Sequence, residues 1–296
     1  MNRGHPDPGT EGGRDTLVTE KKPDETEPAP DLALPEFDTA VAHIARVYDY
    51  WLGGVSHFEV DRRAAKMAAR DFPGIIRGVR EQRAFLARAV RYLAAEQGIR
   101  QFLDIGTGIP SANNTHEVAQ AAAPECRVVY VDNDPMVIAN ARALLRSDGD
   151  RSTFVAADLR DTGTILAEAQ RMLDFSQPVA VLLIGILQLI PDADDPYAIV
   201  GRLLSAVPSG SWLAIAQPTG DVKTSQIAKA AGRFNQRAST PVTLRTHAEV
   251  SRFFAGTDLI PPGVVQLHRW RPLPGGPESD EDIPAYCGLA RKTPTG

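Results

Sequence analysis

Strand-like and helix-like segments alternate through the middle of the chain, and no other feature limits the possible folds as strongly. Each short apolar run typical of a buried strand is followed by a segment with helical spacing. The strand-like runs are residues 101–105, 127–132, 152–158, 178–185 and 211–217. Strands that alternate with helices pair in parallel, because each helix returns the chain to the same edge of the sheet. We therefore predict an α/β fold, a mostly parallel sheet with helices on both faces.

The segments on either side of this region break the alternation. Before it, an apolar stripe from Phe37 to Leu52 and two further helical patterns make residues 37–98 all-helical. After it, residues 263–270 and 285–292 are strand-like, and the loop between them has no helical pattern. Because a parallel pair needs a crossover connection, we expect these two runs to form an antiparallel hairpin.

The first 35 residues differ in composition from the rest of the chain. They hold eight acidic and four basic residues, six prolines and four glycines, and almost no large apolar side chain. Such a segment cannot bury enough apolar surface to offset the entropy lost on ordering. We predict a disordered tail at 1–35, a helical lid at 36–98 and a sheet domain at 99–296. The alternative for the tail is a partner-binding arm.

Charge, hydropathy and cysteine content exclude several classes of protein. The net charge is −5 and most of it lies in the tail, so the body lacks the basic character of a nucleic-acid-binding protein. The longest apolar run, residues 179–190, is shorter than the roughly 20 residues that span a bilayer, and we expect a cytoplasmic location. Two cysteines, Cys126 and Cys287, allow neither a disulfide framework nor a zinc site built from cysteine alone; we read both thiols as inert and expect no metal.

An aspartate stands at the end of each of the first three predicted strands. These are Asp104, ahead of Gly106-Thr107-Gly108, then Asp132, ahead of Asn133, and Asp158, ahead of Leu159. Ligands of open parallel sheets bind at the carboxyl ends of the strands, so the three carboxylates should meet in one site. Each alone could be a turn or cap residue, but three at successive strand ends beside a glycine loop favour ligand binding.

The three carboxylates suit different parts of one ligand. Asp132 is placed to accept hydrogen bonds from two ribose hydroxyls. Asp158 can accept one from the exocyclic amine of adenine, and Asp104 suits an ammonium group. A ligand with an ammonium, a ribose and an adenine but no phosphate is S-adenosylmethionine. A dinucleotide fits less well, because Asp104 would face its pyrophosphate and Ser111 stands where its motif has a third glycine.

At these residues the chain resembles class I S-adenosylmethionine-dependent methyltransferases, and most closely an actinobacterial-type methyltransferase family of unknown substrate. The resemblance rests on ARVYDYWLGG (45–54), QFLDIGTGIP (101–110), VVYVDNDP (128–135), ADLRD (157–161) and the apolar strand leading into IPDADDPY (190–197). It spans about residues 40–292. It implies a Rossmann-like fold with a seven-stranded, mostly parallel sheet, an N-terminal helical lid and a C-terminal antiparallel hairpin. It also implies that the cofactor site is lined by Asp104, Gly106, Thr107, Gly108, Asp132, Asn133, Asp158 and Leu159.

The chain departs from the pattern of that family on the side where the methyl acceptor should bind. The family usually has Lys-Asp-Asn and an aromatic residue after the paired glycines, a histidine after the fourth strand and Ser-His after the fifth. This chain has Val55-Ser56-His57-Phe58, Gln188 and Ala216-Gln217 at those places. Our candidates for the acceptor pocket are Tyr48, Trp51, His57, Gln188 and Gln217, with core packing as the alternative for the two aromatic residues. His116 is read as solvent-facing and His247, within a capping box, as structural.

Together these features predict an enzyme that transfers a methyl group from S-adenosylmethionine to an acceptor, expected to be a small molecule. No residue can be named as a general base from the sequence. The departures on the acceptor side leave a second hypothesis open, a catalytically silent S-adenosylmethionine-binding regulatory protein. A nucleotide-dependent oxidoreductase is disfavoured by the sequence GTGIPS and by the terminal hairpin.

Overall fold

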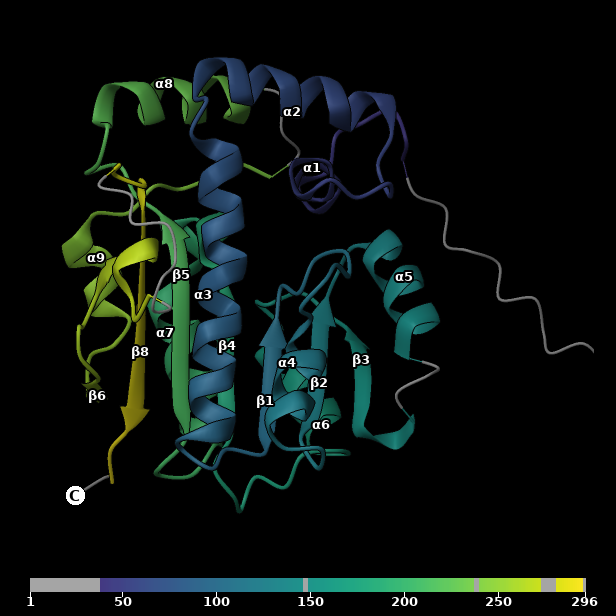
Figure 1. Ribbon diagram of the computed structural model, residues 1–296, viewed down its shortest axis with the longest axis vertical. Coiled ribbons are helices and arrows are strands. Elements are labelled where there is room, and N and C mark those ends of the chain that lie inside the picture. Colours follow the sequence, from purple (N-terminus) through teal and green to yellow (C-terminus); the bar gives the residue numbers. More distant parts are fainter. Residues whose placement is uncertain (1–37, 146–148, 237–239, 273–280, 295–296) are drawn as a thin grey trace, which may run out of the picture. The chain divides into compact units, whose positions relative to one another are not determined.

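One mixed sheet organises the computed structural model, which describes residues 38–145, 149–236, 240–272 and 281–294. Seven strands follow one another in the order β3-β2-β1-β4-β5-β8-β6, and the short β7 also pairs with β8. The bounds are β1 Gln101–Ile105, β2 Arg127–Asp132, β3 Ser152–Ala156, β4 Ala180–Ile184, β5 Trp212–Pro218, β6 Thr257–Leu259, β7 Val265–Gln266 and β8 Ala285–Lys292. Strands β1 to β5 are parallel, and β8 runs antiparallel to β5, β6 and β7 (Figure 1). The predicted mostly parallel sheet with an antiparallel end is confirmed.

The strand order reverses at β1. The chain first adds β2 and β3 on one side of β1 and then places β4 and β5 on its other side. Loops that leave β1 and β4 therefore diverge, and a crevice opens between them at the carboxyl ends of the strands. The topology alone thus points to the place where a ligand would bind.

Helices cover both faces of the sheet because side chains in the central strands alternate in direction. The bounds are α1 Ile44–Leu52, α2 Glu59–Asp71, α3 Ile75–Ala95, α4 Thr115–Ala122, α5 Pro135–Leu145, α6 Thr162–Ala169, α7 Pro196–Ala206, α8 Thr224–Asn235 and α9 His247–Arg252. Phe102 and Leu182 face a core shared with α3 and α4. Leu103 and Leu183 face the opposite core, which includes α6 and α7. The even and odd residues of each strand are thus buried on different faces.

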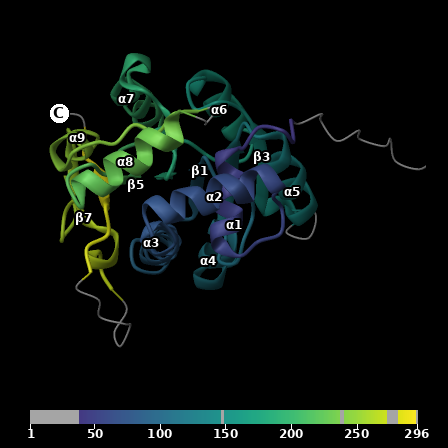
Figure 2. The ribbon, with the colours of Figure 1, turned by 90° about the horizontal axis from the view of Figure 1, so that it is seen from above.

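The N-terminal helices lie across the carboxyl ends of the parallel strands. Figures 1 and 2 show α1 and α2 over β1 and β2, and α8 beside α2 above β5. A small core centred on Val47, Trp51 and Val79 joins α1, α2 and the start of α3. Farther along, α3 packs on the sheet itself. The division at residue 98 into lid and sheet domain stays a prediction, and the predicted tail at 1–35 lies outside the described residues.

Helix α1 begins later than predicted. Residues 38–43 are not helical, and Phe37 lies outside the described residues. The side chain of Arg46 donates to the carbonyls of Asp38 and Val41, which holds this stretch in an irregular conformation. Val41 is 41 % exposed, so the apolar stripe does not continue into this segment. The prediction of a helix over residues 38–43 was therefore wrong.

The C-terminal strands also differ in detail from the predicted hairpin. Of residues 263–270, Val265 and Gln266 pair with β8, and Leu267–Arg269 form a 3-10 turn. The turn directs Trp270 into the core, where its ring meets that of Phe85 edge to face with centroids 5.2 Å apart. Strand β6, a three-residue strand that pairs with the end of β8, was not predicted.

Both cysteines are free and buried, as expected. Burial raises the pKa of the Cys126 thiol to about 11 and that of the Cys287 thiol further still. Because the thiolate is the reactive form, both side chains act as small apolar groups at neutral pH. No helix within the described ranges combines the length and apolarity needed to cross a bilayer.

Candidate active site

A cleft of about 220 Å³ lies at the carboxyl ends of β1 to β4, and residues of α1 and α3 also line it. All eight residues expected to hold a cofactor line this cleft: Asp104, Gly106, Thr107, Gly108, Asp132, Asn133, Asp158 and Leu159. They come from three separate strand ends, which the sheet brings together. Their roles stay a prediction, but their common location agrees with it.

Glycines shape the wall of the cleft after β1. Gly106 has φ +75°, and a Cβ added there would lie 2.5 Å from the Cβ of Ile186 on the loop after β4. A side chain at this position would therefore be both strained and in collision. Gly108, at φ +68°, donates its backbone N–H to Oδ2 of Asp132 at 2.9 Å. This bond ties the glycine loop to the end of β2.

Asp132 has its two oxygens turned toward backbone donors. Besides Gly108, the backbone N–H of Asp134 donates to Oδ1 at 3.0 Å. Burial raises the pKa of the Asp132 carboxyl, and these two hydrogen bonds oppose the change. A carboxylate has about four acceptor positions, so two remain for a ligand. Asp132 thus combines a structural role with the capacity to accept from a diol.

Asp158 already accepts several hydrogen bonds within the protein, which the sequence did not predict. Its carboxylate accepts from the guanidinium of Arg160 at 3.0 and 3.1 Å and from the side-chain amide of Asn133 at 3.0 Å. Arg160 also donates to Asp194 at 2.6 Å. An adenine amine bound here would have to share Asp158 with these donors.

Asp104 and Arg83 place opposite charges in one part of the cleft. Asp104 is 5 % exposed and accepts a 2.6 Å hydrogen bond from the hydroxyl of Thr115. Burial raises the pKa of its carboxyl to about 6, although Thr115 and the charge of Arg83 both oppose the shift. The guanidinium of Arg83 donates to the carbonyls of Ala112 and Asn113, while its Nε is buried without a partner among the described residues. An ammonium facing Asp104 and a carboxylate facing Arg83 would satisfy both groups.

The roof of the cleft is attached to the end of β2. His43, just before α1, lines the cleft and its Nδ1 forms a short contact with Oδ2 of Asp134. Burial alone would raise the pKa of the Asp134 carboxyl, but the hydrogen bond with His43 and two backbone N–H groups lower it overall. The same carboxylate caps α5 through the N–H of Met136.

Comparison with known protein families identifies the family of this chain. Residues 31–293 match the family described as S-adenosyl methyltransferase. The chain belongs to the S-adenosyl methyltransferase family. Membership implies use of S-adenosylmethionine and leaves the acceptor unidentified.

Two solved structures are similar to this S-adenosyl methyltransferase family member over most of its length. A DUF574 family protein from Streptomyces avermitilis MA-4680 is 44 % identical, with a TM-score of 0.82, over 86 % of this chain and 99 % of that one. A candidate methyltransferase from Thermobifida fusca YX is 39 % identical, with a TM-score of 0.81, over 89 % of this chain and 99 % of that one. The search of curated proteins found no match. The predicted family is confirmed.

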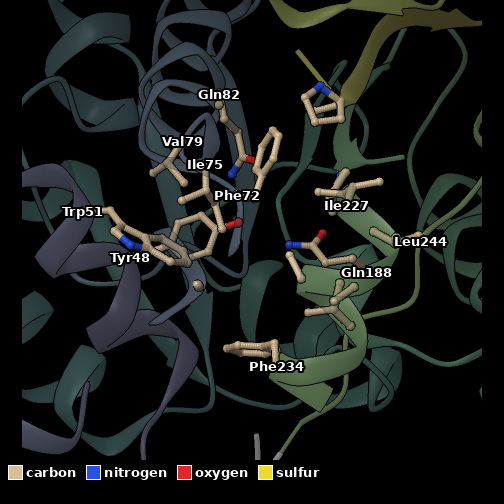
Figure 3. Close-up of a pocket in the computed structure, with 18 of the residues that line it drawn as sticks. Tyr48, Trp51, Phe72, Ile75, Val79, Gln82, Gln188, Ile227, Phe234 and Leu244 are labelled. Carbon is tan, nitrogen blue, oxygen red and sulfur yellow. The ribbon is translucent and has the colours of Figure 1, made fainter. Parts of the chain in front are cut away.

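A second, apolar pocket of about 110 Å³ adjoins this cleft. It lies between the α1–α3 side and α8 (Figure 3). Three residues line both spaces: Ile44, Tyr48 and Gln82. A molecule in this pocket would therefore lie next to a methyl donor bound in the cleft.

Three of the five acceptor-pocket candidates line this second pocket and two do not. Tyr48, Trp51 and Gln188 are part of its wall, although the indole N–H of Trp51 also donates to the carbonyl of Ala65 at 3.2 Å. His57 lies outside both spaces, with Nδ1 2.9 Å from Oδ2 of Asp49. Gln217 is fully buried in β5 and accepts from Arg245. Both stand apart from the pocket because their side chains are held by other partners, His57 by Asp49 and Gln217 by Arg245.

The interpretation of His116 as solvent-facing was wrong. It is 7 % exposed, and its Nδ1 lies 2.7 Å from the hydroxyl of Tyr130. Helix α3 covers this part of α4, so a position that looks exposed along the helix is buried. His247 begins α9 next to the predicted capping box of Thr246 and Glu249, which is confirmed.

Sequence reasoning missed two polar residues of α3 that reach the cleft, Gln82 and Arg83. Gln82 is 8 % exposed and falls on the buried stripe between Val79 and Phe85. A long polar side chain on such a stripe was a signal, because buried amides need partners. Arg83 had no comparable signal, since arginine is common on helix surfaces.

Proposed function

We propose that this protein transfers a methyl group from S-adenosylmethionine to a small molecule bound in the apolar pocket. One observation carries the proposal: a polar cleft with paired opposite charges adjoins an apolar pocket, and Tyr48 and Gln82 line both. The cleft suits the cofactor and the pocket suits an acceptor. Their common boundary is where a methyl group would pass.

Different residues of the cleft would contact different parts of the cofactor. Asp104 would hold the ammonium of its methionine part and Arg83 the carboxylate, which gives Arg83 a partner for its buried Nε. Asp132 would accept from the ribose hydroxyls. Leu159, 4 % exposed, would form part of an apolar wall for the adenine. When bound, the cofactor supplies an electrophilic methyl group on a positively charged sulfur.

The surroundings of the acceptor position favour orientation over proton removal. Burial raises the pKa of the Tyr48 hydroxyl to about 12, so this group keeps its proton at neutral pH and acts as a hydrogen-bonding group. His57 is held away by Asp49. Rate enhancement would then come from holding the acceptor close to the methyl carbon in a space that excludes water.

The cofactor assignment can be tested on Arg83. We expect Arg83→Met to weaken the binding of S-adenosylhomocysteine at least tenfold, since a hydrogen bond to a charged group contributes about 1.5–3 kcal/mol. Arg80→Met, on the exposed side of the same helix, is the matched control and should bind normally. Titration calorimetry measures both. Equal affinities for the two variants would contradict the role of Arg83 in binding the carboxylate.

To decide between an enzyme and a regulatory protein, methyl transfer must be measured separately from cofactor binding. Full-length protein incubated with S-adenosylmethionine labelled in the methyl group and with a small-molecule extract should yield a labelled product. Arg83→Met at the same cofactor concentration should yield much less. Tight cofactor binding with no transfer under any of these conditions would favour the catalytically silent regulatory protein.

A further inference from the structure

Two polar groups extend into the apolar pocket from opposite walls. Figure 3 shows the hydroxyl of Tyr48, from α1, and the amide of Gln188, from the loop after β4, directed into the same space. Gln82 from α3 adds a second amide at the boundary with the cofactor cleft. A few polar groups in an otherwise apolar wall are what fixes the orientation of a bound small molecule.

Gln188 offers an acceptor that the protein itself does not use. Its Nε2 donates to the carbonyl of Gly185 at 2.7 Å, which fixes the amide directly behind the wall of the cofactor cleft. The residue is 2 % exposed, and its Oε1 is buried without a partner among the described residues. A buried amide oxygen left in this way is unfavourable unless a ligand donates to it.

The other residues that line the apolar pocket disfavour a charged ligand. None of the described residues that line this pocket carries a formal charge, and four of them, Tyr48, Trp51, Phe72 and Phe234, are aromatic. A charged ligand would lose its hydration here without gaining a countercharge. The volume of about 110 Å³ is below the roughly 150 Å³ of an engineered cavity that takes up benzene, so the space holds no ligand larger than a single ring.

Resting on the proposed function, we propose that this pocket binds an uncharged aromatic amine, which donates an N–H to Oε1 of Gln188 and is methylated on that nitrogen. The neutral nitrogen needs no base before it reacts. Its lone pair forms the new bond to the methyl carbon while the C–S bond breaks, and that electron pair stays on sulfur. S-Adenosylhomocysteine leaves as a neutral thioether, and the methylated ammonium then loses its proton to water.

Three single-ring probes test the two requirements. Aniline is uncharged at pH 7.5 and carries an N–H; toluene matches aniline in size and shape but lacks the N–H, and benzylamine is a cation. Full-length protein saturated with S-adenosylhomocysteine is titrated with each, and binding is followed by saturation-transfer NMR. We expect aniline to bind at least tenfold more tightly than either of the others. Gln188→Leu should abolish the difference between aniline and toluene, while the variant still binds S-adenosylhomocysteine.

A variant that fills the apolar pocket tests whether aniline binds there. Ala231 on α8 lines the pocket, so Ala231→Phe should abolish aniline binding, whereas Ala228→Phe on the exposed side of the same helix should not. Normal affinity of Ala231→Phe for S-adenosylhomocysteine shows that it is folded. Equal binding of aniline and either toluene or benzylamine, or unchanged binding of aniline to Ala231→Phe, would overturn the acceptor assignment alone. Failure of the wild type to bind S-adenosylhomocysteine would overturn the proposed function instead.

Discussion

Replacing Asp104 with asparagine should make the ligand-free protein more stable at neutral pH while weakening its binding of the cofactor. The carboxyl of Asp104 is buried, and its pKa is about 6 instead of 3.8. The folded protein therefore keeps this proton to a higher pH than the unfolded chain does. Stability is lost as the pH rises from about 4 to about 6, and above pH 6 the full cost of the buried charge is present.

The size of that cost follows from the pKa. Each pH unit of difference corresponds to 1.36 kcal/mol, so the ionised carboxylate destabilises the folded state by about 3 kcal/mol at neutral pH. Asparagine retains an oxygen that can accept the 2.6 Å hydrogen bond from Thr115 and carries no charge. We expect Asp104→Asn to gain about 1–3 kcal/mol at pH 7.5, which corresponds to a melting temperature several degrees higher. At pH 4.5 the gain should be about a third as large, because the carboxyl of the unfolded chain is already mostly ionised there.

Thermal unfolding of the two proteins at both pH values measures the effect. Asp134→Asn is the matched control, because the pKa of this neighbouring carboxyl is lowered and its removal should cost stability at pH 7.5. Calorimetry with S-adenosylhomocysteine should show at least a tenfold weaker affinity for Asp104→Asn. The reasoning is refuted if Asp104→Asn is no more stable than the wild type at pH 7.5, or if its gain is the same at pH 4.5.

Two further predictions concern the walls of the cleft. Gly106→Ala should lower the melting temperature and reduce cofactor binding more than tenfold, because the added methyl meets Ile186 and the backbone conformation there is strained for alanine. Thermal unfolding measures the first effect and calorimetry the second. Gly201→Ala, where a Cβ has open space, is the control. If α1 acts as a lid, S-adenosylmethionine should raise hydrogen-exchange protection at residues 45–58 as well as in the loop after β1. Protection confined to the strand ends would mean that α1 is scaffold only.

Local patterns were enough for many of the elements. The predicted strands 101–105 and 127–132 have the observed bounds. Each is marked by a short apolar run, which is a property of the local sequence. The predictions failed where a distant segment decided the outcome. Residues 38–43 are held by Arg46, which is itself bound to Asp61 of α2, and His116 is covered by α3.

The same contrast between local patterns and long-range contacts holds for the candidate site. Periodicity and chain direction are local properties, so the sequence predicted the order of strands and helices and placed Asp104, Asp132 and Asp158 at strand ends that a parallel sheet must bring together. The folded structure was needed to show that Arg83 lines the same cleft as Asp104, that Oε1 of Gln188 has no partner among the described residues, and that His57 does not line the apolar pocket. Those relations depend on how α1, α3 and α8 pack over the sheet, and that packing is set by contacts between residues far apart in the chain.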